Sequence, residues 1–135
     1  MNKERSHKSL EEPDKIQGKI ESIIVNDDVD ILLELAKKIG KELASAKLSK
    51  GQFRNLFDSI KRIEMEGEFS RRKLVLLKPK MEHVVSRVSK EKKESMQNLR
   101  DVLSVAIDSV GSDAKRFERF VEFFEAILCY HEANT

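Results

Sequence analysis

An aromatic-rich stretch near the C-terminus, residues 113–131, constrains the fold of this chain more than any other segment. Its apolar residues recur every three or four positions, which places them on one side of an α-helix. They are Phe117, Phe120, Val121, Phe124, Ile127 and Leu128. Phe123 and Tyr130 widen this apolar side beyond what a helix on a protein surface needs. Because aromatic side chains bury large areas, we predict a central helix, either wrapped by the other helices or shared with a partner chain.

The same spacing recurs along most of the 135 residues, and the chain has only two Pro and five Gly. So few turn-forming residues argue against a β-sandwich or barrel. We predict an all-α fold, a compact bundle of about five helices ending in a long, aromatic-rich C-terminal helix. No apolar run is long enough to span a membrane, and the N-terminus lacks the apolar core of a signal peptide. Together with the single Cys, this composition predicts a cytoplasmic protein.

The polar N-terminus differs in amino-acid composition from the rest of the chain. Residues 1–17 have no sustained apolar side, and we predict a mobile arm there. Residues 18–135 are predicted to form a single helical-bundle domain. In the first long helix of this domain, the residues expected to be buried are Val29, Leu32, Leu33, Ala36, Ile39 and Leu43.

Local signals predict where helices begin and end. The expected N-terminal caps are Asn26 or Asp27, then Ser49 in a capping box with Gln52, and finally Ser112 or Asp113 before the last helix. Gly111 is expected to end the preceding helix. Pro79 disfavours helical geometry at Lys78, so a kink or break is expected at that point.

Charge is distributed unevenly along the chain, although the net charge is only +2. Residues 47–93 carry 14 Lys and Arg against 6 Asp and Glu, whereas both ends are mildly acidic. In the helix that follows the capping box, Lys50, Arg54 and Lys61 are spaced to form a basic stripe along one edge of the apolar side. A basic stripe on a rigid helix favours an anionic partner, above all a nucleic-acid backbone.

The residue types needed for metal binding or catalysis are not suitably spaced. Cys129 and His131 are two positions apart on a helix and point in different directions, and His83 is distant in sequence. No phosphate-binding Gly-rich loop or nucleophile motif occurs. We therefore predict a protein that is not an enzyme and has no catalytic residues, metal or cofactor, with Cys129 as a small buried hydrophobic residue.

Two other functions fit the same residues. The chain could be a protein–protein adaptor that dimerises through its C-terminal helix, with its basic middle facing an acidic protein. A helix-turn-helix DNA regulator is less favoured: it would place Gln52, Arg54 and Asn55 near the start of a recognition helix, but the connection before Ser49 is longer than that motif uses.

Three stretches together resemble a known family. They are KIGKELASAKLSKGQFRNLFDSIKRIE, RRKLVLLKPKMEHVVSRV and RFERFVEFFEAILCYHE, in that order. Within them, residues 48–55, the turn at 77–81 and residues 120–131 are similar to motifs of the small helical subunit of type III-A CRISPR effector complexes, the Csm family. The match covers about residues 30–133.

This resemblance implies a non-catalytic subunit of an RNA-guided antiviral ribonucleoprotein. Several copies would stack with the other subunits beside the guide RNA and target RNA, holding the RNA backbone while base pairing selects the sequence. The basic positions of the family fall on Lys47, Lys50, Arg54, Arg62, Lys78, Lys80 and Arg87. An isolated copy would be able to form a homodimer, and no membrane association is implied.

Overall fold

A computed structural model describes residues 13–135, and all regular secondary structure in this range is α-helical. The helices are α1 (Pro13–Ile24), α2 (Val29–Ser45), α3 (Lys50–Met65), α4 (Arg71–Val75), α5 (Leu77–Arg87), α6 (Lys90–Val110) and α7 (Ala114–Ala133). The all-α prediction is confirmed. The described range holds seven helices rather than about five, because α1 runs for three turns and α4 and α5 are separate.

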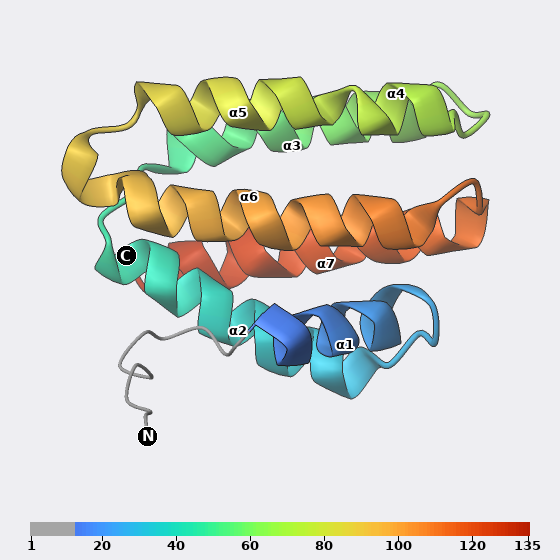
Figure 1. The fold of residues 1–135 in the computed structure, drawn as a ribbon, viewed down its shortest axis with the longest axis horizontal. Coiled ribbons are helices and arrows are strands. Elements are labelled where there is room, and N and C mark those ends of the chain that lie inside the picture. Colours follow the sequence, from blue (N-terminus) through green and yellow to red (C-terminus); the bar gives the residue numbers. More distant parts are fainter. Residues whose placement is uncertain (1–12) are drawn as a thin grey trace.

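The helices are arranged in three layers (Figure 1). One outer layer contains α3, α4 and α5, the middle layer contains α6 and α7, and the other outer layer contains α1 and α2. The described residues of α2 pack against α1, α6 and α7 but make no contact with α4 or α5. The two outer layers are therefore separated by the middle one.

The predicted central helix is α7, which packs against α1, α2, α3 and α6. Phe120, Phe123 and Phe124 are completely buried, and the Phe124 ring meets the Phe57 ring edge-on at 5.6 Å between centroids. Full burial of one such side chain stabilises a fold by roughly 1.5–3 kcal/mol. The aromatic side of α7 is wrapped by its own chain, so it is not the free face that the adaptor hypothesis required.

The helices α2 and α7 run in the same direction and pack closely against each other. At one end, the Arg119 guanidinium donates hydrogen bonds to the carbonyl oxygens of Ile24 and Val25, at 3.1 and 3.2 Å. At the other end, Gly40 lies against the backbone of Tyr130 and His131. A Cβ at Gly40 would stand 2.6 Å from the Tyr130 Cβ, so glycine is needed there for close packing.

Most of the predicted helix boundaries are confirmed. The Ser49 capping box is present, with the Ser49 N–H donating to Gln52 Oε1 at 3.4 Å. Asp113 caps α7 through hydrogen bonds from the N–H groups of Lys115 and Arg116, and Gly111 ends α6 with a φ of 59°. The cap of α2 was predicted wrongly. It is Asp28, because Asp27 adopts a left-handed conformation with a φ of 58°.

Two further predictions need correction. Val29 and Leu33 are 57% and 47% exposed, and Leu35 is buried in their place. The first two turns of α2 hold five large apolar residues, Val29, Ile31, Leu32, Leu33 and Leu35, so the sequence pattern fitted more than one face. The break expected at Pro79 lies earlier, at Leu76. Pro79 is the third residue of α5, where the missing N–H costs no intrahelical hydrogen bond.

The predicted arm, residues 1–17, falls mostly outside the described residues, which begin at Pro13. The helix α1 also begins at Pro13, so residues 13–17 are part of α1 rather than of an arm.

Candidate nucleic-acid interface

A groove of about 710 Å³ lies between α3 and α5. From α3 and its cap, the groove is lined by Ser49, Gly51, Gln52, Asn55, Leu56 and Ser59, and from α5 by Lys80, His83, Val84 and Arg87. Both sets recur every three or four residues, so each set occupies one side of its helix. The Lys80 Nζ donates a hydrogen bond to the Ser59 Oγ at 3.2 Å, which joins the two walls.

The chemistry of this groove suits an anion. Lys80 and Arg87 bring positive charge from α5, while Gln52, Asn55 and Ser59 bring amide and hydroxyl donors from α3. The N-terminus of the 16-residue helix α3 also borders the groove at Ser49 and Gly51. Unpaired N–H groups and the positive end of the helix dipole are concentrated at such a terminus.

The predicted basic stripe lies on the other edge of α3, facing α7. The Lys50 Nζ forms an ion pair with Glu132 Oε2 at 2.8 Å, and the Lys61 Nζ pairs with Glu64 at 2.6 Å. The hydrogen bond from Lys50 holds the pKa of Glu132 below its ordinary value, and the charge of Arg54 acts in the same direction. Arg54 therefore lies on this edge too, with its side chain exposed.

The remaining predicted residues are dispersed. Lys47 is exposed in the connection between α2 and α3, with a φ of 62°. Arg62 is exposed on α3. Lys78 lies on the side of α5 that faces α6, where its Nζ pairs with Asp108 at 2.7 Å.

The seven predicted basic residues therefore do not form one surface. Only Lys80 and Arg87 line the groove. The sequence analysis considered basic residues only, and it missed His83 and Ser59 as groove residues. The spacing of Lys80, His83 and Arg87, which places them on one side of a short helix, would have indicated that His83 belongs to the groove. Gln52 and Asn55, which the helix-turn-helix hypothesis grouped with Arg54, face the groove while Arg54 faces α7.

The structure also gives the positions of the residues considered for metal binding. Cys129 is exposed, so its prediction as a buried residue was wrong. His131 is buried, with Nε2 at 2.9 Å from the Leu48 carbonyl oxygen and its ring edge-on to Phe53. Across residues 13–135, no group of three or more His, Cys, Asp or Glu could hold a metal ion. None of the seven helices there is long and apolar enough to cross a membrane.

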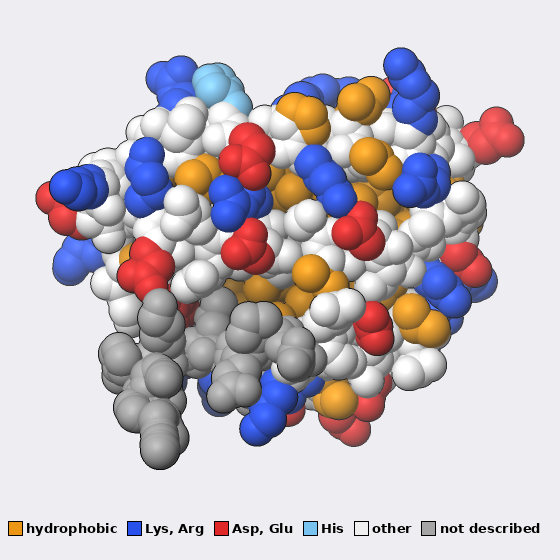
Figure 2. All heavy atoms as spheres, in the orientation of Figure 1, with side chains coloured by type: hydrophobic (Ala, Val, Ile, Leu, Met, Phe, Trp, Pro, Cys, Tyr) orange, Lys and Arg blue, Asp and Glu red, His pale blue; other side chains and the backbone are white. Residues whose placement is uncertain are grey.

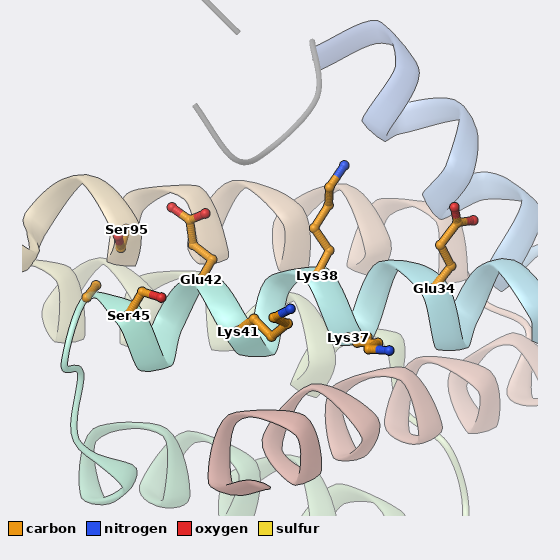
Figure 3. Close-up of a pocket in the computed structure, with 8 residues that line it drawn as sticks. Glu34, Lys37, Lys38, Lys41, Glu42, Ser45 and Ser95 are labelled. Atoms are coloured by element: carbon orange, nitrogen blue, oxygen red, sulfur yellow. The ribbon is translucent and has the colours of Figure 1, made fainter. Parts of the chain in front are cut away.

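A second cleft, of about 620 Å³, lies along α2 and reaches Ser95 of α6. Glu34, Lys38 and Glu42 project from one side of α2, whereas Lys37 and Lys41 lie on another (Figure 3). Glu42 Oε1 is buried without a hydrogen-bond partner. Because carboxylates alternate with lysines, this cleft suits an anionic backbone less well than the groove between α3 and α5.

The fold and the groove together define an all-α protein with a cationic groove between two helices of one outer layer. A family model described as Csm2 Type III-A matches residues 26–135. The chain belongs to this family and is a small subunit of type III-A CRISPR complexes, as the resemblance of its three motifs implied. No curated protein and no solved structure matches the chain.

Proposed function

We propose that this subunit holds the guide–target RNA of its complex by the phosphate backbone, with the groove between α3 and α5 as the main contact. The observation that carries the proposal is the convergence of Lys80 and Arg87 with Gln52, Asn55 and Ser59 around one open groove. Phosphate oxygens accept hydrogen bonds from all of these side-chain types. The Lys80 Nζ is already directed across the groove toward Ser59.

The composition of the groove favours backbone contacts over base recognition. Its lining contains no Phe, Tyr or Trp, and His83 is the one aromatic ring there on which an unpaired base would stack. Base pairing between guide and target supplies the sequence choice in RNA-guided systems, so a subunit that follows phosphates is sufficient. Membership of the Csm2 family supports this role, because it places the chain in such a complex.

The proposed role is structural and non-catalytic, with several copies of the subunit arranged along the RNA in the cytoplasm. Lys47, Arg54 and Arg62 are exposed and able to reach phosphates beside the groove. Lys50 and Lys78 would first have to leave Glu132 and Asp108. We therefore rank Lys80 and Arg87 above the other five predicted contacts.

The test is RNA retention by the complex reconstituted with the Lys80→Glu and Arg87→Glu double variant, measured across a salt series. Each lost phosphate contact should lower the slope of log affinity against log salt by roughly 0.7–0.9, so the double variant should lose about twice that. The matched control is Lys37→Glu with Lys41→Glu, which makes the same charge change on α2. Equal losses in the two variants would show a general charge effect and reject the groove.

A further inference from the structure

Exposed large hydrophobic side chains in the described residues occur at only four positions: Val29, Leu33, Met65 and Leu76. One such residue alone would need no explanation, because single apolar side chains are common on protein surfaces. Three of the four, however, lie beside charged side chains that are mostly of one sign. Leu76 lies among cations, and Val29 and Leu33 lie among carboxylates.

The basic patch consists of Arg72, Lys73 and Leu76. Leu76 joins α4 to α5, is 50% exposed, and donates its N–H to the Arg72 carbonyl oxygen at 3.1 Å. This helical spacing places the Arg72 and Lys73 side chains beside Leu76. Both cationic side chains are exposed, and Lys73 forms an ion pair with Glu66. Figure 2 shows hydrophobic side chains exposed among Lys and Arg over the layer of α4 and α5.

The acidic patch consists of Val29, Asp30, Leu33 and Glu34 in the first turns of α2. Val29 and Leu33 are four residues apart and form an exposed apolar row. Asp30 and Glu34, each one residue further on, form an exposed acidic row beside it, and the cation Lys37 ends the apolar row four residues beyond Leu33. The two patches are therefore complementary, because each has an apolar centre and the charges around the two centres are opposite.

We propose that these two patches are the two sides of a contact between copies of this chain, the basic patch of one copy docking on the acidic patch of the next. This inference rests on the proposed function, in which several copies line the RNA, and it names the surfaces by which they meet. The patches lie in opposite outer layers, on helices that do not contact each other. A contact between different surfaces leaves one patch free at each end, so copies can be added in a row.

Charge also disfavours the symmetric alternative. A two-fold dimer through either patch would set like charges against each other, Arg72 and Lys73 against their own copies or Asp30 and Glu34 against theirs. Such juxtaposition is unfavourable in an interface. Head-to-tail docking instead pairs cations with carboxylates around a buried Leu76, which is the arrangement of an apolar anchor inside a polar rim.

The test is disulfide trapping in the complex reconstituted with the other subunits and RNA, with Cys129→Ser as the background. A chain that carries both Leu33→Cys and Leu76→Cys should give a ladder of covalent dimers, trimers and larger products when an oxidant is added. Each single variant should give no ladder. The control chain carries Leu33→Cys and Met65→Cys, because Met65 is 80% exposed but lies outside both patches.

Charge reversal gives a second readout that does not depend on cysteine placement. Arg72→Glu with Lys73→Glu should lower the ladder yield at least tenfold, equivalent to about 1.4 kcal/mol. Adding Asp30→Lys and Glu34→Lys to the same chain should restore the ladder, a result that misfolding cannot produce.

A ladder no stronger than that of the Met65 control, or covalent dimers from Leu76→Cys alone, would overturn the proposed contact. The Lys80→Glu and Arg87→Glu variant separates this inference from the proposed function. A chain that combines Lys80→Glu and Arg87→Glu with Leu33→Cys and Leu76→Cys should lose RNA retention but still form the ladder. If the ladder fails in complexes that retain RNA normally, only the contact between copies is rejected.

Discussion

The Lys50 Nζ lies 2.8 Å from Glu132 Oε2, although the two residues are 82 positions apart in the chain. The ion pair joins the first turn of α3 to the last turn of α7. Both side chains are more than half exposed, at 54% and 57%, so the pair contributes little to stability. Under the proposed function the pair matters more for RNA binding, because it occupies a lysine that the family resemblance assigns to RNA.

We expect Glu132→Gln to increase RNA retention by the complex, because it releases Lys50 and removes a negative charge beside Arg54. In the unmodified chain, Lys50→Ala should weaken retention less than Lys80→Ala. In the Glu132→Gln background, the effect of Lys50→Ala should grow. Filter binding across a salt series measures all four variants. Equal effects of Lys50→Ala in both backgrounds would mean that the ion pair does not compete with RNA.

Gly40→Ala should destabilise the fold by about 1–3 kcal/mol, the usual cost of forcing atoms into a packed interior. The added Cβ would lie 2.6 Å from the Tyr130 Cβ and 2.8 Å from the His131 backbone nitrogen. Since one of these atoms belongs to the backbone, α2 and α7 would have to separate. Urea unfolding followed by circular dichroism measures the loss.

The matched control for this prediction is Gly18→Ala in α1. A Cβ at Gly18 meets nothing within 4 Å, and alanine is the better helix former by roughly 1 kcal/mol. This control should therefore be neutral or stabilising. If both substitutions shift the urea midpoint equally, close packing at Gly40 does not explain the destabilisation caused by Gly40→Ala.

His131→Ala should destabilise the fold by about 2–4 kcal/mol through a cavity and an unpaired carbonyl group. The buried ring fills the space beside Phe53 and bonds the Leu48 carbonyl, which holds the α2–α3 connection against the end of α7. Thermal unfolding measures the loss. His83→Ala is the control, since His83 is exposed in the groove: it should leave the unfolding temperature unchanged. A similar stability loss in both variants would contradict the assignment of His131 as the structural histidine.

Local sequence signals predicted the parts of the fold that depend on a single helix. The aromatic side of α7, the capping box at Ser49 and the end of α6 at Gly111 each follow from residues within a few positions of one another. The exposed side of α2 could not be predicted in this way, because the apolar residues of its first turns, Val29, Ile31, Leu32, Leu33 and Leu35, fit more than one buried face. Only packing against α1, α6 and α7 decides that Leu35 is buried and Leu33 is not.

The candidate site was harder to predict because two helices build it. The charge run between residues 47 and 93 located the basic part of the chain, but charge alone did not show which cations share a surface. Lys78 and Lys80 are two residues apart, yet one faces α6 and the other faces α3. Lys50 and Glu132 form a pair that no local pattern reveals.

The last prediction concerns Glu42, whose carboxyl group is partly buried in the cleft along α2. Burial raises its pKa above the ordinary value of 4.5, and the nearby charge of Glu94 raises it further. The folded protein thus binds the Glu42 proton more tightly than the unfolded chain does. The stabilisation from this proton is fully present below pH 4.5 and is lost as the pH rises through the raised pKa.

Ionisation of Glu42 places a charge on a partly buried carboxylate whose Oε1 has no hydrogen-bond donor. Glu42→Gln should therefore raise the unfolding temperature at pH 7, because the neutral amide avoids the cost of a poorly solvated charge. The gain should shrink as the pH falls toward 4.5, where the native carboxyl group becomes protonated. Differential scanning calorimetry between pH 4 and 8 measures both effects. Glu34→Gln, an exposed change on the same helix, serves as the control for the loss of one carboxylate from α2. A gain from Glu42→Gln that stays constant across this range would show that packing, rather than ionisation, causes it.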